Sequence, residues 1–179
     1  MSEKTIKQYD NSIKKCREIF EKKNNDYGTS WRIMRLSSIL DQIFIKATRI
    51  RTIEEKGEMK IDEGVESELI GIINYSLMAL IQIECNIDLE LNTSKILELY
   101  DKNILQTKNL MLEKNHDYGE VWREMQVSTF TDMLLMRIHR MRQILENDGK
   151  TIASEGIESN FSDMINYSVF ALIRMSEKS

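Results

Sequence analysis

The run KNNDYG at residues 23–28 recurs as KNHDYG at residues 114–119, an offset of 91 positions. Trp31-Arg32 recurs at the same offset as Trp122-Arg123. After one inserted residue, INYS at residues 73–76 recurs at residues 165–168. Ordered matches at rare residue types are not expected by chance. The chain is therefore a tandem duplication, with copy one at residues 1–84, a connection at 85–92 and copy two at 93–179.

The number of copies limits the architecture. Two copies are too few for an open solenoid, which usually needs three or more repeats. We therefore expect a closed pseudo-twofold pair that packs like a homodimer within one chain.

Hydrophobic periodicity predicts three helices in each copy, and so an all-α fold with about six helices. In copy one they are expected at about residues 5–23, from Ser37 or Ser38 to residue 56, and from just after Gly64 to residue 84. Asn24–Gly28 are residue types that favour a chain reversal. Copy two repeats the plan over residues 95–175, with Thr93 or Ser94 as the expected helix cap.

Composition narrows the function. The 179 residues carry a formal net charge of −4, so direct DNA binding is not expected. There is no apolar run of membrane-spanning length and no signal-peptide core, so a soluble, cytoplasmic protein is expected. Cys16 and Cys85 show no metal-binding spacing, and there is no proline. Further assembly into a homo-oligomer remains open.

Polar residues on the second and third helices are informative because these helices are otherwise apolar on almost every side. Asp41, Arg49 and Glu55 project within about one third of the helix circumference. Glu66, Ile70 and Asn74 form an i, i+4, i+8 row on the third helix. Buried charges are costly unless they are paired or bind a ligand or metal. A polar centre shared by the two copies is therefore expected.

Each of these residues also has a purely structural interpretation. Asp41 follows Ser38 at the spacing of a capping box, and Asp132 follows Thr129 in the same way. Acids near a helix start are favoured by the helix dipole alone. Arginines can neutralise such acids, and a tryptophan is more often a core anchor than a stacking surface. His116 and His139 have no counterpart in copy one, which argues against a histidine metal site and against histidine-based nucleophilic catalysis.

The pattern K-N-x-D-Y-G-x-x-W-R, followed by D-x-x-x-x-[KR]-x-x-R-x-R and E-G-x-E…I-N-Y, resembles the nucleotide modification associated domain type 1 family in the tandem form of Bacteroidetes-type bacteria. The resemblance implies a link to DNA-base modification and nucleotide metabolism, without an established activity. Phage members often carry an acid before the Asn-Tyr pair. Asp163 stands there in copy two and Gly71 in copy one, so copy two is expected to be the better-equipped site.

The chain is also loosely similar to all-α nucleotide pyrophosphohydrolases of the MazG and dimeric dUTPase type. Those proteins hold Mg²⁺ over nucleotide phosphates with acids on adjacent helices, but their E-E-x-x-E helix is not reproduced here. Oxygen ligands suit Mg²⁺, which can activate a water for phosphoanhydride cleavage. The candidate metal ligands are Asp41, Glu63, Glu66, Asp132, Glu155, Glu158 and Asp163.

A nucleotide or similar small molecule is the expected partner. Basic side chains can hold phosphate oxygens, and aromatic ones can stack on a base. Three functions remain open: a Mg²⁺-dependent nucleotide hydrolase, a non-catalytic nucleotide-binding or base-modification accessory module, and a structural or partner-binding protein. The candidate substrate-binding residues are Lys23, Asp26, Tyr27, Trp31, Arg32, Lys46, Arg49 and Asn74 in copy one, and Lys114, Asp117, Tyr118, Trp122, Arg123, Arg137, Arg140 and Asn166 in copy two.

Overall fold

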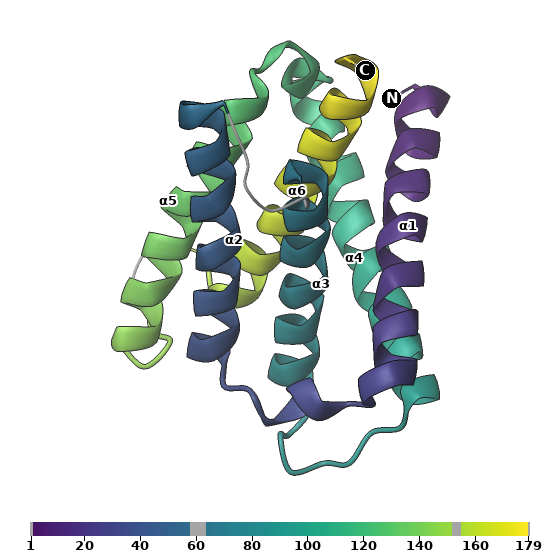
Figure 1. Cartoon of the computed structure of the whole chain (residues 1–179), viewed down its shortest axis with the longest axis vertical. Helices are drawn as coiled ribbons and strands as arrows, with labels where there is room; N and C mark the ends of the chain where they lie inside the picture. Colours follow the sequence, from purple (N-terminus) through teal and green to yellow (C-terminus); the bar gives the residue numbers. More distant parts are fainter. Residues whose placement is uncertain (1, 58–63, 152–154, 179) are drawn as a thin grey trace.

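The fold is all-α in the computed structural model, which describes residues 2–57, 64–151 and 155–178 (Figure 1). No strand occurs among these residues, as predicted. The elements are α1 (Glu3–Tyr27), η1 (Ser30–Ile33), α2 (Leu36–Lys56), α3 (Val65–Glu84), α4 (Thr93–Tyr118), η2 (Val121–Glu124), α5 (Val127–Glu146) and α6 (Ile157–Lys178), where η denotes a short 3₁₀ helix.

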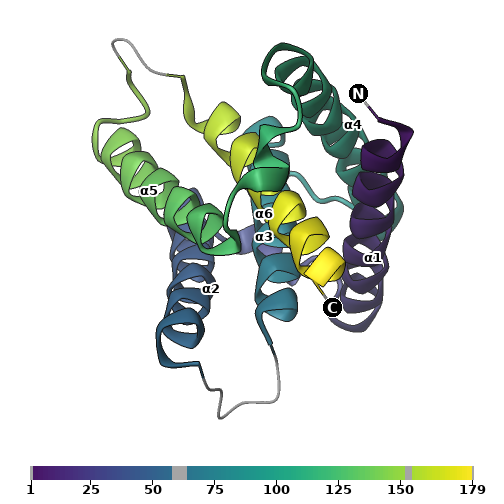
Figure 2. The same ribbon diagram turned by 90° about the horizontal axis from the view of Figure 1, so that it is seen from above.

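The six helices form three layers of two (Figures 1 and 2). The central pair is α3 and α6, which pack against each other. On one side lie α2 and α5, and on the other lie α1 and α4. Both α1 and α4 contact both central helices, α3 of copy one and α6 of copy two. The duplicated halves therefore share one core. No helix in the described part of the chain has the length and apolar character needed to cross a membrane.

Two buried tyrosines tie the copies together. Tyr9 Oη donates a hydrogen bond to Asn166 Oδ1 (2.7 Å), and Tyr100 Oη donates to Asn74 Oδ1 (2.9 Å). Each asparagine amide nitrogen also donates to a backbone carbonyl of the first helix of its own copy, at 3.1 and 3.2 Å. The two sets of bonds relate equivalent positions, which is the pseudo-twofold arrangement expected from the repeat.

A second pair of equivalent contacts joins α2 to α5. Arg142 lies 3.0 Å from Asp41, and Arg51 lies 2.6 Å from Asp132. The N-cap of α2 is Arg35, and no side chain caps this helix. The capping-box interpretation of Asp41 is therefore wrong, because its carboxylate faces the other copy. The same holds for its equivalent, since α5 also lacks a side-chain cap.

The first helix is longer than predicted, because α1 continues through the expected chain reversal to Tyr27. The side chain of Asn24 donates to the carbonyl of Phe20 one turn back, so this asparagine does not compete with the helix backbone. The helix ends at Gly28, whose φ of 66° is accessible to glycine without strain. The cap of α4 lies one residue before the predicted Thr93. It is Asn92, whose side chain accepts a hydrogen bond from the backbone N–H of Lys95 (2.8 Å).

Arg123 of η2 joins the start of α1 to the end of α6. Its guanidinium donates to Thr5 (2.6 Å), Gln8 (2.8 Å) and Glu177 (2.8 Å). It also donates to Glu120 at 3.2 Å. Burial is the largest single influence on Glu120 and raises its pKa, but hydrogen bonds from two hydroxyl groups and from Arg123 outweigh it. The net effect holds the pKa of Glu120 below its usual value of 4.5.

This lowered pKa predicts an acid-sensitive contribution to stability. A carboxylate whose pKa is lower in the folded than in the unfolded protein stabilises the fold at pH values above its unfolded-state pKa. This contribution is lost as the pH falls through the pKa of the folded state. We expect Glu120→Gln to reduce the free energy of unfolding by about 1 kcal/mol near neutral pH, since the group is partly solvated. Denaturant unfolding of both proteins at about pH 7 and about pH 3 measures this. An unchanged difference at the two pH values would contradict the assignment.

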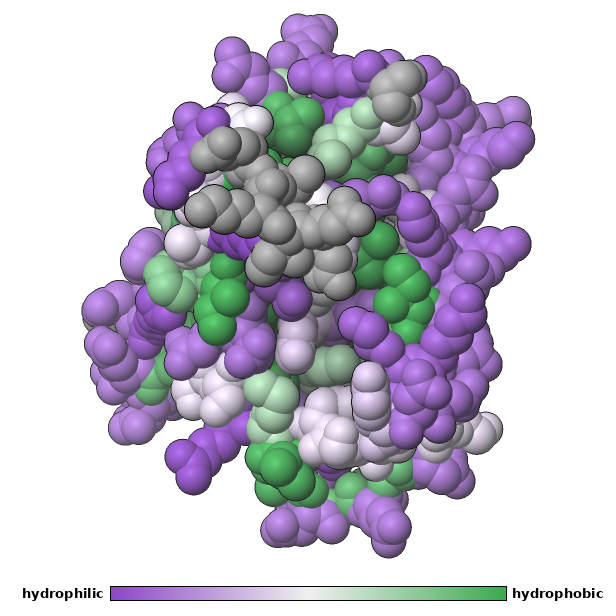
Figure 3. All heavy atoms as spheres, in the orientation of Figure 1, coloured by the Kyte–Doolittle hydropathy of each residue, from purple (hydrophilic) through white to green (hydrophobic). Residues whose placement is uncertain are grey.

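The surface seen in the orientation of Figure 1 is largely hydrophilic, with hydrophobic side chains scattered among polar ones (Figure 3). Such isolated apolar residues are normal on a folded protein and indicate no function by themselves.

Candidate functional site

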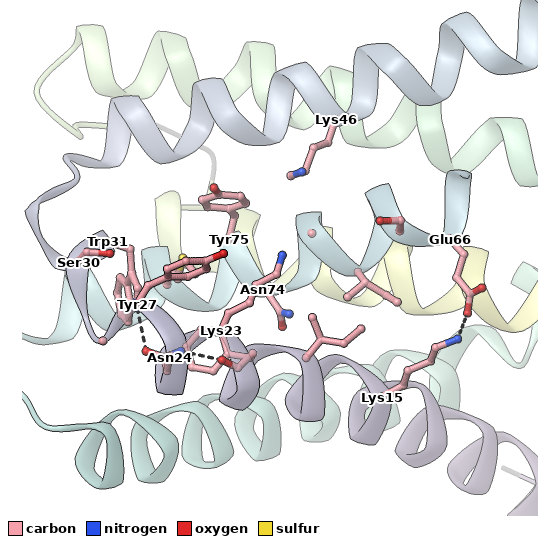
Figure 4. A pocket seen from close by; sticks show the side chains of 17 residues that line it. Lys15, Lys23, Asn24, Tyr27, Ser30, Trp31, Lys46, Glu66, Asn74 and Tyr75 are labelled. Carbon is pink, nitrogen blue, oxygen red and sulfur yellow. Dashed lines mark hydrogen bonds and ion pairs between the residues drawn. The ribbon is translucent and has the colours of Figure 1, made fainter. Parts of the chain in front are cut away.

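A cavity of about 570 Å³ opens in copy one between α1, η1, α2 and α3 (Figure 4). We call it the copy-one groove. Its floor is the row predicted on α3, where Glu66, Ile70 and Asn74 all line it. Gly71 lies in the same floor and leaves it without a side chain at that point. The volume falls within the range of small-molecule sites.

Aromatic side chains gather at one end of the groove. Tyr27 and Trp31 lie near the junction of α1 and η1, and Tyr75 rises from α3 (Figure 4). Trp31 is held by a hydrogen bond from its Nε1 to Asn24 Oδ1 (3.2 Å). Tyr27 is 71% exposed, so its ring is accessible to a ligand. These rings offer a partly formed stacking surface.

Two lysines reach into the groove from opposite sides. Lys23 comes from α1 and Lys46 from α2 (Figure 4). Lys46 Nζ lies 5.7 Å from the ring centre of Tyr75 and 3.6 Å from the carboxylate of Glu68. Within residues 2–57, 64–151 and 155–178, no ion pair or side-chain hydrogen bond involves Lys23. The groove therefore contains one lysine available for an anion beside another that is weakly paired.

Glu68 was missed by the sequence analysis, which singled out Glu66 instead. Glu68 is buried and takes a 2.7 Å hydrogen bond from Arg49. The same arginine was a candidate ligand-binding residue, but this contact directs it to an internal acid. A comparison of the two copies could have drawn attention to Glu68, because the equivalent residue of copy two is the uncharged Asn160.

At its far end the groove is bounded by an ion pair between Lys15 of α1 and Glu66 of α3 (Figure 4). The same two residues also line a second cavity of about 470 Å³ between α1 and α6. The predicted metal ligand Glu66 thus faces a lysine, at the boundary between the two cavities.

Copy two arranges its charges differently. Asp163 has a side chain only 3% exposed and lies 2.8 Å from Lys114 and 3.0 Å from Arg137. The contact with Arg137 is an ion pair without hydrogen-bond geometry, because that guanidinium donates instead to Asn160 (2.9 Å) and Tyr167 (3.1 Å). The basic residues expected to bind a ligand are occupied by an internal acid. The geometry favours copy one, contrary to the expectation from the acid in copy two.

Several of the candidate substrate-binding residues are buried in the core of the protein. Trp122 is 4% exposed and stacks on Phe170, with ring centres 4.3 Å apart. Asn74 and Asn166 use their amide groups in the tyrosine bonds between the copies, although Asn74 also borders the groove. Burial keeps the ring of Trp122 away from a ligand, and the printed bonds of the two asparagines direct their amide groups to the contact between the copies.

The two equivalent arginines of the 3₁₀ helices are also structural. Arg32 is buried, contacts Gln82, and donates to the carbonyls of Asn86 (2.5 Å) and Leu89 (3.1 Å). It therefore fixes the connection between α3 and α4. Arg123 makes the contacts between α1 and α6 described above. Neither of the guanidinium groups lines the copy-one groove.

The remaining candidates for substrate binding lie on the surface. The carboxylate of Asp117 lies 3.2 Å from the ring of its neighbour His116. The other three are exposed and do not line the copy-one groove: Asp26, Tyr118 and Arg140.

Those of the predicted carboxylates that the structure describes are not brought together around a common metal site. No group of three or more His, Cys, Asp or Glu side chains that could hold an ion occurs among the described residues. Asp41 and Asp132 lie in the ion pairs between α2 and α5, and Asp163 is enclosed by basic residues. The structure places Glu155 and Glu158 as exposed residues, and Glu63 lies outside the described residues.

Neither cysteine lines the copy-one groove. Burial raises the pKa of the Cys16 thiol to about 12, so it is not a thiolate at neutral pH. Cys85 is half-buried, and both cysteines are unpaired. The geometry instead suits an anionic molecule with a flat ring, held by lysines and tyrosines.

Comparison with known proteins agrees with the repeat. The family model described as nucleotide modification associated domain 1 matches twice, over residues 23–83 and 114–175. The matched segments include most of α3 and of α6, the groove lysines Lys23 and Lys46, and the equivalent residues of copy two, Lys114 and Arg137. No curated protein and no solved structure matches the chain, and the looser similarity to MazG-type pyrophosphohydrolases is not shown. The chain belongs to the nucleotide modification associated domain 1 family and carries its domain twice.

Proposed function

We propose that the copy-one groove binds a nucleotide, with its phosphate toward the lysines and its base toward the aromatic end. The observation that carries this proposal is the accessible Lys23 beside Lys46 in a groove that also contains aromatic rings, with Lys46 Nζ 5.7 Å from the ring centre of Tyr75. The family name adds a link to nucleotides in general. A nucleoside phosphate combines the two features that such a groove recognises.

The expected contributions are of familiar size. Stacking of a base on an aromatic side chain is worth about 1–3 kcal/mol by alanine substitution. Lysine acts on phosphate as a mobile point charge, and hydrogen bonds to an ionised group are roughly twice as strong as neutral ones. Tyr27 and Trp31 would supply the stacking and Lys23 the phosphate contact. Both kinds of contact would favour binding of a nucleoside phosphate over the nucleoside or the phosphate alone.

Binding without chemistry is the form of the proposal that the geometry favours. Hydrolysis with Mg²⁺ needs oxygen ligands that are free to hold the ion. Glu66, which lines the groove, is paired with Lys15, and Glu68, which contacts the groove residue Lys46, is paired with Arg49. Mg²⁺ therefore enters the proposal only as a possible companion of the phosphates.

The test uses the full chain and a panel of ribo- and deoxynucleoside mono-, di- and triphosphates, with the matching nucleosides as controls. A ligand that binds only the folded state raises the unfolding temperature by mass action. We expect a concentration-dependent rise with phosphorylated compounds, a smaller one with nucleosides, and a stoichiometry near one by calorimetry. No rise with any nucleotide would overturn the proposal.

The same samples distinguish the catalytic alternative. Each nucleotide is incubated with the protein and Mg²⁺ or Mn²⁺, and release of phosphate and pyrophosphate is measured. We expect the nucleotide to be recovered intact. Turnover that follows the protein through purification and depends on the metal would replace the binding module with a hydrolase.

A further inference from the structure

The two copies place one acid at different positions on their third helices. Copy one has Glu68 and Gly71, whereas the equivalent residues of copy two are Asn160 and Asp163. The acid has thus moved by one helical turn along the same face. The basic residues around it are retained as Lys or Arg in both copies. The repeat therefore contains two versions of one charge arrangement.

In copy two the acid neutralises the pair of basic residues that is equivalent to the groove lysines of copy one. Asp163 lies between Lys114 (2.8 Å) and Arg137 (3.0 Å). These residues correspond to Lys23 and Lys46. A buried carboxylate between two cations is a favourable arrangement only while all three groups are present.

In copy one the corresponding acid is displaced toward a different cation. Glu68 makes its short contact with Arg49 (2.7 Å) and only a longer one with Lys46 (3.6 Å). No described carboxylate pairs with Lys23. Among the residues that the structure describes, the groove therefore has no counterpart of the anion that copy two supplies from its own chain.

Gly71 marks the place that this anion would occupy. A Cβ atom built on Gly71 would lie 2.7 Å from Lys46 Cε and 3.1 Å from Lys46 Nζ. The side chain of Lys46 thus reaches over the point from which Asp163 extends in copy two. Lys23 lines the same space from α1 (Figure 4).

We propose that the anionic group of the ligand sits over Gly71 between Lys23 and Lys46, as the carboxylate of Asp163 sits between its two cations. Copy two is then the same site in a self-occupied form. This inference rests on the proposed nucleotide-binding function for the ligand's identity, but the anion position stands on the geometry of the repeat. The chemical class recognised at this point is a phosphate or a similarly small oxyanion.

Two substitutions would give each copy the charge arrangement of the other. Gly71→Asp should place a carboxylate between the lysines and close the copy-one groove to anions. The nearest atoms belong to the flexible end of Lys46, which can move aside. Gly71→Asn occupies a similar volume without a charge. Asp163→Gly should free Lys114 and Arg137 and create a second anion site.

The experiment measures binding of inorganic pyrophosphate and of the four common deoxynucleoside triphosphates by calorimetry on the full chain. Gly71→Asp is expected to weaken both kinds of ligand by at least about tenfold. It should also raise the unfolding temperature above that of Gly71→Asn, because only the aspartate can pair with the lysines. Asp163→Gly is expected to raise the pyrophosphate stoichiometry from one toward two.

The outcomes separate this inference from the proposed function. Nucleotide binding that is unchanged by Gly71→Asp would overturn the anion position and leave the nucleotide groove standing. Pyrophosphate binding that Gly71→Asp abolishes, without binding of any nucleotide, would support the anion position and overturn the nucleotide proposal. No binding of pyrophosphate or nucleotide would overturn both. If Asp163→Gly fails to fold, the comparison of Gly71→Asp with Gly71→Asn decides alone.

Discussion

Asn166→Ala is expected to lower the free energy of unfolding by about 2–3 kcal/mol. The asparagine is 4% exposed, accepts a hydrogen bond from Tyr9 Oη (2.7 Å) and donates to the carbonyl of Thr107 (3.2 Å). Alanine would leave the buried Tyr9 hydroxyl without a partner, which costs about 1–3 kcal/mol, and would add a small cavity, whereas the Thr107 carbonyl lies inside α4 and keeps its helical bond. Urea unfolding of the variant measures the loss.

Asn103→Ala is the matched control. Asn103 is buried to a similar extent at 7% exposure, but its amide donates to Leu99 O (2.9 Å) within the same helix and only weakly elsewhere. A helical carbonyl keeps its backbone partner when this side chain is removed, so the expected loss is about 1 kcal/mol. Equal losses in the two variants would show that the bond between the copies carries no special weight.

The pair formed by Tyr9 and Asn166 can be isolated further with a double-mutant cycle. Tyr9→Phe and Asn166→Ala should together cost less than the sum of the single changes, because either one already breaks the shared hydrogen bond. The equivalent cycle at Tyr100 and Asn74 should give a similar coupling energy. Strict additivity in both cycles would contradict the described network.

The sequence predicted the duplication, the all-α class and most helix boundaries, because these depend on local periodicity and on repeated rare residues. It misplaced the end of α1, where Asn24 and Tyr27 looked like a turn. Whether asparagine breaks a helix depends on where its side chain finds a partner, and Asn24 bonds within α1 and to Trp31. That partner becomes evident only after η1 folds back.

The candidate site was predicted less well because side-chain partners lie far away in sequence. Asp41 and Arg142 are 101 positions apart, and their ion pair exists only because α2 and α5 lie side by side. Residue type alone marked Asp41 as a metal ligand. Arg32 likewise resembled a phosphate-binding arginine, but it reaches carbonyls of the connection between α3 and α4. Lys23, Tyr27, Trp31 and Lys46 were predicted and do line one groove.

Lys23→Met is expected to weaken binding of a nucleoside triphosphate about tenfold or more, with little change in protein stability. Lys23 lines the groove and makes no ion pair with any described residue, so its removal breaks no internal contact. A charge-assisted contact with phosphate is worth about 1.5–3 kcal/mol, which corresponds to a factor of about ten to more than a hundred in affinity. The measurement is the dissociation constant by calorimetry at fixed salt.

Lys22→Met is the matched control, since Lys22 is the neighbouring residue of α1, is exposed and does not line the groove. It changes the net charge by the same amount, so any general electrostatic effect appears in both variants. A direct contact predicts that only Lys23→Met lowers affinity strongly and weakens its dependence on salt. Equal small losses in the two variants would mean that the lysine acts through the overall field of the protein, and the phosphate would then lie elsewhere. Since no acid in the described part of the chain pairs with Lys23, a loss of affinity without a loss of stability is the result that a purely structural lysine could not produce.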